Sequence, residues 1–168
     1  ESNPMTPEKF DVVILGGGNA GIGVTGPVRH AGMSVAMIEA DLLGGTCPNR
    51  GCVPSKLLIG FADAARHARD ADRHFIHSSF HGADLAKIFT SVNEYVGGVD
   101  GRYQHRVDAA DVTLIRGEGR FTGHKQIEAA GRTLTADKIV IATGSRPAPP
   151  PFGHLAVWTS DDLFPLRC

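Results

Sequence analysis

The chain has 168 residues, which is the length of one domain and enough to bury an adequate hydrophobic core. Its net charge is −1, and no basic stripe indicates a nucleic-acid partner. No apolar stretch approaches the roughly 20 residues that span a membrane, and no secretory signal is recognisable, so we expect a cytoplasmic protein without membrane or nucleic-acid partners. Residues 1–4 precede Met5 and are interpreted as the remnant of a tag, with residues 1–9 forming a tail.

The first predicted element is a strand at residues 10–15 (FDVVIL), a short apolar run rich in β-branched side chains. It leads into Gly16, Gly18 and Gly21, which fit the spacing G-x-G-x-x-G of a dinucleotide-binding turn. In such a turn, Gly16 permits the tight bend, Gly18 lets the backbone approach a pyrophosphate, and Gly21 lets the helix pack closely on the strand. The N-terminus of that helix offers N–H groups and a positive dipole end to phosphates.

A second strand is predicted at residues 34–38 and ends at Glu39, an acid roughly 20 residues after the glycines, where such folds bind a ribose 2′-hydroxyl. A glycine-rich turn with a chance acid is the alternative. Pro27 fits poorly within the helix predicted over residues 22–31, because it lacks a backbone donor and crowds the preceding turn. That helix is therefore expected to be short, kinked or restarted at Pro27, and to end at Gly32.

The three cysteines are Cys47, Cys52 and Cys168. Three is a small and odd number, which does not suit a disulfide framework, so a redox or catalytic use is favoured. In a regular helix, residues five apart lie roughly 7.5 Å apart along the axis, beyond the usual Cα separation of a disulfide. A bond between Cys47 and Cys52 therefore requires a distorted turn, and a strained bond is easier to reduce. Three residues in this segment suit such a distortion: Pro48, Gly51 and Pro54.

A helix is predicted at residues 55–70, and a helix N-terminus stabilises a nearby thiolate. Arg50 and Lys56 add positive charge beside the two thiols. Two alternatives remain open, namely inert buried thiols and half of a zinc site. Further zinc ligands would have to come from His74, His77 and His81, for which a solvated loop position is favoured, so no metal site is predicted.

Three motifs follow one another along the chain: GGGNAG at 16–21 with Glu39, GGTCPNRGCVPSK at 44–56, and KIVIATGSRP at 138–147. Together they resemble the N-terminal part of the pyridine-nucleotide-disulfide oxidoreductases, the flavoprotein family of dihydrolipoamide, glutathione, mycothione and mercuric reductases. The cysteine motif is highly specific, and the other two support it. The resemblance implies an α/β, Rossmann-like, three-layer FAD-binding fold with a parallel sheet and a small antiparallel β-meander.

The resemblance also implies roles for individual residues. Cys52 would be the thiol next to the flavin, Cys47 the interchange thiol that attacks the substrate disulfide, and Lys56 a neighbour of flavin N5. The implied FAD-binding residues are Gly16, Gly18, Asn19, Ala20 and Gly21 at the pyrophosphate, Glu39 at the adenosine ribose, Gly45 and Thr46 beside the pyrophosphate and flavin, Gly119 at the adenine, and Ala142, Thr143 and Gly144 in a loop that returns to FAD. Pro48 and Arg50 depart from the apolar residues common in the motif, and Arg50 adds charge on the substrate side.

The rest of the chain is less informative. Residues 84–110 have the spacing of a helix with one apolar face, which we expect to pack over the sheet; by resemblance it lines the flavin region or a dimer contact. Residues 112–115, 117–121, 126–129 and 133–134 alternate and predict the antiparallel meander. Residues 138–142 are an apolar run typical of a buried parallel strand, and residues 147–151 form a proline-rich exit.

The sequence thus predicts a first segment of an FAD-binding domain at 10–147 and an exit linker at 148–168. By resemblance, electrons pass from NAD(P)H through FAD to the Cys47–Cys52 disulfide and on to a small-molecule or lipoyl disulfide, in a homodimer. The length leads us to expect a truncated fragment, without the NAD(P)H-binding and dimer domains, that does not turn over alone. The alternatives are a non-catalytic flavin-binding module and an NAD-binding protein with incidental thiols.

Overall fold

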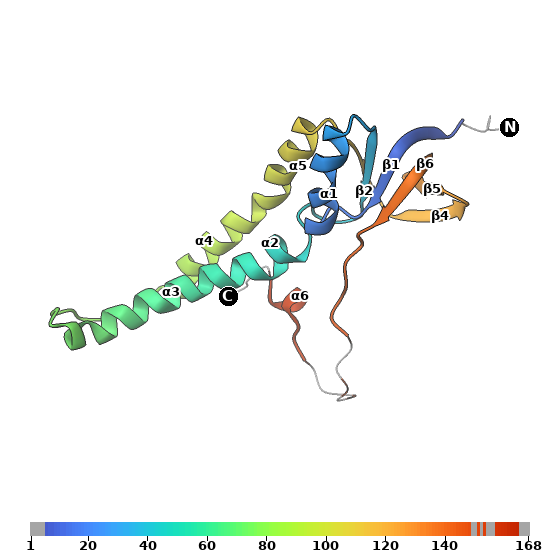
Figure 1. The fold of residues 1–168 in the computed structure, drawn as a ribbon. Coiled ribbons are helices and arrows are strands. Elements are labelled where there is room, and N and C mark those ends of the chain that lie inside the picture. The colour runs from blue at the N-terminus through green and yellow to red at the C-terminus, as the bar shows by residue number, and fades with distance from the viewer. Residues whose placement is uncertain (1–5, 149–150, 152, 154–156, 165–168) are drawn as a thin grey trace. The chain divides into compact units, whose positions relative to one another are not determined.

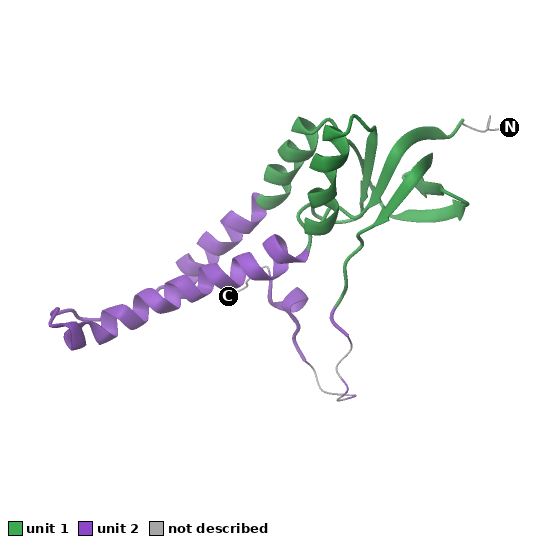
Figure 2. Cartoon of the chain, viewed as in Figure 1, with its two compact units in different colours: residues 1–45, 99–146 green, residues 46–98, 147–168 purple. Residues whose placement is uncertain are grey.

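The computed structural model describes residues 6–148, 151, 153 and 157–164 (Figure 1). This chain divides into two compact units, shown in Figure 2. Unit 1 comprises residues 1–45 and 99–146, and unit 2 comprises residues 46–98 and 147–168. The predicted proline-rich exit at 147–151 lies partly outside the described residues, and Cys168 lies wholly outside them.

Unit 1 is built on a six-stranded sheet with the strand order β3-β2-β1-β6-β5-β4. The strands are β1 (Glu8–Leu15), β2 (Val35–Glu39), β3 (Thr113–Arg116), β4 (Gly119–Gly123), β5 (Gln126–Ala129) and β6 (Arg132–Ile141). The pairs β3-β2, β2-β1 and β1-β6 are parallel, whereas β6-β5 and β5-β4 are antiparallel. The predicted α/β class, with a parallel sheet and an antiparallel meander, is therefore confirmed.

Both faces of this sheet are covered, because side chains of successive strand residues point to opposite faces. On one face, α1 (Asn19–His30) packs over β1 and β2, and α5 (Val99–Ala109) packs beside β3 (Figure 1). The core on this face buries Val12, Ile14, Val35, Met37 and Val107. On the other face, the meander packs against the alternate residues of the same strands, burying Val13, Leu15, Ala36, Ile38, Ile127, Ala129 and Leu134. The result is three layers: helices, parallel sheet and meander.

Two strand predictions were wrong in their pairing. Residues 112–115 do not belong to the meander, because β3 pairs in parallel with β2 and forms the edge of the parallel sheet. Residues 133–134 and 138–141 are not separate strands either, since both lie in the ten-residue β6, and Ala142 follows its end. β6 pairs with β5 at its start and with β1 along most of its length. Its second half is also not a buried strand, because Ile141 is 68% exposed and Ile139 is only partly buried.

The first helix, α1, continues through Pro27 without a break. Pro27 lies near the C-terminal end of α1, where its missing N–H removes a single backbone bond, and its carbonyl still accepts from the N–H of Ala31 at 3.1 Å. Gly32 follows with a φ of +76°, the left-handed conformation that ends many helices. The predicted end at Gly32 is confirmed, and Pro27 neither shortens nor restarts the helix.

Unit 2 is helical. Its elements are α2 (Thr46–Arg50), α3 (Cys52–Asp70), the 3-10 helix η1 (Ala71–His74), α4 (Leu85–Gly97) and the short α6 (Ser160–Leu163). A small apolar core joins α3, α4 and the residue after α6, formed by Leu57, Leu58, Phe89, Val92, Val96 and Phe164. The long helix predicted over 84–110 is in fact two helices that separate at Gly98, with α4 in unit 2 and α5 in unit 1. The consecutive glycines 97 and 98 explain the break, because glycine loses more backbone entropy in a helix than other residues.

Several carboxyl groups of this fold have a pKa below the ordinary value because they accept hydrogen bonds. The side chain of Arg132 lowers the pKa of Glu8, and backbone N–H groups, with adjoining side chains, lower those of Asp11, Asp84 and Asp162. A lowered pKa in the folded state adds stability above the unfolded-state pKa, and this stability is lost as the pH falls through the folded value.

We therefore expect the free energy of unfolding to decrease as the pH falls below about 5, since the unfolded chain then binds more protons than the folded one. Urea unfolding followed by circular dichroism at pH 7, 5, 4 and 3 measures this. The Asp11 carboxylate accepts hydrogen bonds from the N–H and the hydroxyl of Ser34. Asp11→Asn removes its negative charge and should therefore weaken the dependence of the unfolding free energy on pH. A stability that rises below pH 5 would contradict the expectation.

Candidate functional site

The glycine loop between β1 and α1 contains two glycines that the fold itself requires. Gly16 has a φ of +103°, and a Cβ added there would overlap the carbonyl oxygen of Ala142. A Cβ added at Gly21 would overlap the carbonyl oxygen of Gly16, so a side chain there would push α1 away from β1. These contacts account for the tight turn and the close helix packing without any ligand.

Gly18 differs from its two neighbours in the motif. Its φ of −77° suits any residue, and an added Cβ would make only an ordinary contact, 3.6 Å from Cα of Gly45. Gly18 is the N-cap of α1, and no side chain caps the helix there. The first-turn residues Asn19 and Ala20 are exposed. Packing thus does not require a glycine at 18, whereas close approach of a phosphate to this helix N-terminus does.

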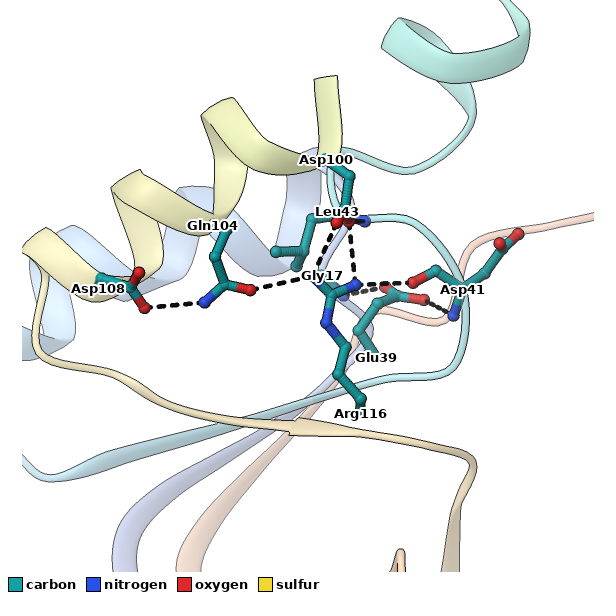
Figure 3. Close-up of polar contacts among 8 residues, drawn as sticks. All are labelled: Gly17, Glu39, Asp41, Leu43, Asp100, Gln104, Asp108 and Arg116. Atoms are coloured by element: carbon teal, nitrogen blue, oxygen red, sulfur yellow. Dashed lines mark hydrogen bonds and ion pairs between the residues drawn. The ribbon is translucent and has the colours of Figure 1, made fainter. Parts of the chain in front are cut away.

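A second loop, loop 39–45, runs from the end of β2 back to the glycine loop. The Glu39 carboxylate accepts a hydrogen bond from the Gly17 N–H at 2.6 Å and another from the Asp41 N–H at 2.8 Å (Figure 3). The Gly44 N–H donates to the carbonyl of Gly17 at 2.9 Å, and Gly45 approaches Gly18 closely. A carboxylate has about four lone-pair positions, so Glu39 keeps acceptor capacity for a hydroxyl.

The third motif reaches the same loop from the end of β6. The Ala142 N–H donates to the carbonyl of Leu15 at 2.7 Å, directly before the glycine loop. Thr143 and Gly144 follow and are exposed. Gly119, at the start of β4, has a packing role, because an added Cβ would lie 2.6 Å from Cδ2 of Leu15. Unit 1 therefore brings residues 16–21, 39–45 and 142 together.

The two thiols lie in unit 2, on either side of a helix break. Cys47 is in α2 and Cys52 is the first residue of α3; both are present as thiols, with Cys52 exposed and Cys47 half-buried. Gly51 between them has φ −140° and ψ −108°, neither helical nor extended. A Cβ added at Gly51 would lie 3.5 Å from Cα of Cys47, so the chain folds closely on itself here. The backbone between the two cysteines therefore departs from a regular helix.

The surroundings of the thiols include a cavity within unit 2. It has a volume of about 640 Å³ and is lined by Arg50, Gly51 and Ser55 together with residues of α6 and Trp158. Arg50 forms an ion pair with Asp161 at 4.0 Å. Lys56 is exposed on α3. Arg50 replaces an apolar residue that is common in the motif, and it thus places a cation at the wall of this cavity.

In the described part of the chain, no cluster of three or more His, Cys, Asp or Glu side chains could hold a metal ion. Within those same residues, no helix is both long and apolar enough to cross a membrane.

The candidate residues are shared between the two units. Unit 1 holds the three glycines of the motif, Asn19, Ala20, Glu39, Gly45, Gly119 and residues 142–144, and unit 2 holds Thr46, Cys47, Cys52 and Lys56. The sets meet in the sequence at the peptide bond between Gly45 and Thr46. Sequence reasoning missed Asp100 and Arg116, which contact loop 39–45 from α5 and β3, because two isolated charges 16 residues apart give no local signal.

Comparison with known proteins decides the family. The sequence model of the protein family described as "Pyridine nucleotide-disulphide oxidoreductase" matches residues 10–162 of this chain. The chain belongs to this family. Among curated relatives of the family, glutathione reductase of Burkholderia cepacia is 32% identical over 163 residues, covering 96% of this chain and 36% of the relative.

Two further relatives carry other names. Dihydrolipoyl dehydrogenase of Chlamydia pneumoniae is 33% identical, covering 88% of this chain and 32% of the relative. Mercuric reductase of Lysinibacillus sphaericus is 32% identical, covering 90% of this chain and 28% of the relative. The chain spans about a third of the length of the curated relatives it matches. The identities to these three differently named enzymes are nearly equal, so they do not single out a substrate.

Proposed function

We propose that the protein is an FAD-dependent pyridine nucleotide-disulfide oxidoreductase, in which electrons pass from NAD(P)H through FAD to the Cys47–Cys52 pair and on to a small-molecule or lipoyl disulfide. The observation that carries this is the glycine at 18. The fold does not require it, yet it lies at an uncapped helix N-terminus in the same chain as the thiol pair. Residues 10–147 would be the first segment of the FAD-binding domain and 148–168 an exit linker.

The chain's own residues fit FAD as follows. Backbone N–H groups at the start of α1 would hold the pyrophosphate, and Glu39 would accept from a ribose hydroxyl with the lone pairs left by Gly17 and Asp41. Gly45 and Thr46 would follow the cofactor towards the thiols, with Lys56 near flavin N5. Gly119 would lie at the adenine, and Ala142, Thr143 and Gly144 would close the site. FAD, when bound, supplies hydride acceptance from NAD(P)H and transfer of two electrons to a disulfide.

The thiol pair completes the reaction by exchange. The Cys47 thiolate attacks one sulfur of the substrate disulfide, the substrate S–S bond breaks, and one substrate thiol leaves after taking up a proton. The Cys52 thiolate then attacks Sγ of Cys47, which releases the second substrate thiol and forms the Cys47–Cys52 disulfide. Two electrons and two protons thus convert one substrate disulfide into two thiols.

One observation must be reconciled with these roles. The more accessible thiolate attacks first, yet Cys52 is exposed and Cys47 is half-buried. The proposal requires that bound FAD covers Cys52 and leaves Cys47 as the reactive thiol. The order in which the two thiols are alkylated, with and without FAD, tests this requirement.

The test of the function begins with the purified chain and FAD. After removal of unbound FAD, we expect a yellow protein, and titration with dithionite should produce a long-wavelength thiolate–flavin absorption band. Cys52→Ser should lack the band, whereas Cys168→Ser should keep it. A protein that stays colourless after reconstitution contradicts the proposal, and binding of NADH without FAD would favour an NAD-binding module instead.

A further inference from the structure

Arg116 lies at the end of β3 and is the centre of a polar network at loop 39–45 (Figure 3). Its guanidinium donates two parallel hydrogen bonds to the Asp100 carboxylate, each of 3.0 Å. It also donates to the carbonyl of Asp41 at 3.1 Å and to the side-chain oxygen of Gln104 at 3.0 Å. Gln104 in turn donates to Asp108 at 2.8 Å, so one side of α5 orients the guanidinium.

Asp100 makes a second contact with the same loop. Its carboxylate accepts from the Leu43 N–H at 2.8 Å, while Arg116 holds the carbonyl of Asp41. The ion pair therefore binds one donor and one acceptor of the loop backbone. Because Asp100 is in the first turn of α5 and Arg116 ends β3, both anchors belong to regular elements of unit 1.

Both ends of this loop carry groups of the proposed cofactor site. At its start, Glu39 pairs in register with Arg116, and its carbonyl accepts from the Gly117 N–H at 2.9 Å. At its end, Gly44 and Gly45 lie against the glycine loop. A shift of residues 41–43 would thus move the ribose acid and the pyrophosphate-side glycines together.

We propose that Arg116 and Asp100 are positioning residues that hold loop 39–45 in its cofactor-competent conformation and thereby set the affinity for FAD. This inference rests on the proposed function. Neither residue needs to touch FAD. Their side chains are 42% and 31% exposed, and an ion pair at such a position adds little to global stability, so its effect is concentrated on local opening of the loop.

The consequence for binding follows from the population of the competent loop. The apparent dissociation constant rises in inverse proportion to that population. If Arg116→Ala lowers the population of the cofactor-competent loop to about a tenth, the apparent dissociation constant for FAD rises about tenfold. Arg116→Lys keeps the charge but cannot make the bidentate contact, so it should restore only part of the affinity.

Arg29 provides a matched control in the same unit. It donates to two backbone carbonyls, those of Ala110 and Met33, and pairs with the carboxylate of Asp111, away from loop 39–45. The experiment measures FAD affinity by fluorescence titration for the unsubstituted chain, Arg116→Ala, Arg116→Lys and Arg29→Ala, together with urea stability and amide hydrogen exchange at Leu43. We expect weaker FAD binding and faster Leu43 exchange for Arg116→Ala, and unchanged affinity for Arg29→Ala.

The outcomes separate this inference from the function on which it rests. If the unsubstituted chain does not bind FAD, the proposed function fails, while Leu43 exchange still reports whether Arg116 orders the loop. If the unsubstituted chain binds FAD and Arg116→Ala binds it equally well, the inference is overturned. Equal weakening by Arg29→Ala and Arg116→Ala would also overturn it, since the effect would then be one of general stability.

Discussion

Alanine at position 18 is expected to leave the protein folded and to weaken FAD binding about tenfold or more, which is about 1.4 kcal/mol of binding free energy. Gly18 has an ordinary φ, and an added Cβ meets only Cα of Gly45 at 3.6 Å. The change in unfolding free energy should therefore stay within about 1 kcal/mol, the range for replacing an N-cap residue. The added methyl group would instead occupy the space that a pyrophosphate needs next to the backbone.

The contrast with Gly21 makes this result interpretable. Alanine at 21 would overlap the carbonyl oxygen of Gly16, so we expect a loss of about 3 kcal/mol or more of unfolding free energy. Gly23→Ala in the same helix has no atom within 4 Å of the added Cβ and should gain about 0.5–1 kcal/mol. Urea unfolding and FAD titration of all three variants test the set. Equal FAD affinity for Gly18→Ala and the unsubstituted chain would remove the main support for the cofactor site.

Binding of FAD is expected to reverse the order in which the two thiols react with iodoacetamide. Without FAD, the exposed Cys52 should be alkylated before the half-buried Cys47. With FAD bound, Cys52 should be protected and Cys47 should react first, because the proposed interchange thiol must remain accessible. Trypsin cleaves after Arg50 and so places the two cysteines in different peptides, whose alkylation can be followed over time by mass spectrometry.

The Gly18→Ala variant supplies the control for this reversal, since it retains both thiols and is expected to bind FAD poorly. It should show the order of the FAD-free protein at FAD concentrations that reverse the order in the unsubstituted chain. If FAD binds and Cys52 still reacts first, the roles assigned to the two cysteines are wrong, although FAD binding itself would stand.

The family and much of unit 1 were predictable from local patterns. The strand–glycine–helix order around β1 and the end of α1 at Gly32 depend on residues close together in the chain, and the structure has them as expected. The break between α4 and α5 was not predicted, because the apolar spacing continues on both sides of it. The consecutive glycines 97 and 98 are the local signal that could have indicated it.

Local patterns did not predict which strands pair with one another. Residues 112–115 alternate in the same way whether they form a meander or the edge of a parallel sheet, so the pattern does not choose between them. The polar residues Thr135 and Asp137 separate Leu134 from the apolar run that follows Lys138, and the single strand therefore looked like two. Only the pairing of β6 with both β1 and β5 joins its halves.

By itself, the sequence determined the family, the glycine-rich turn and the thiol pair, because glycine spacing and cysteine spacing are local constraints on backbone and chemistry. The tertiary structure alone decided which of the motif glycines the fold needs, since that depends on contacts of Gly16 and Gly21 with carbonyl groups and on their lack at Gly18. It also decided that Arg116 and Asp100 hold loop 39–45, since these residues come from different elements and meet only when α5 packs beside β3.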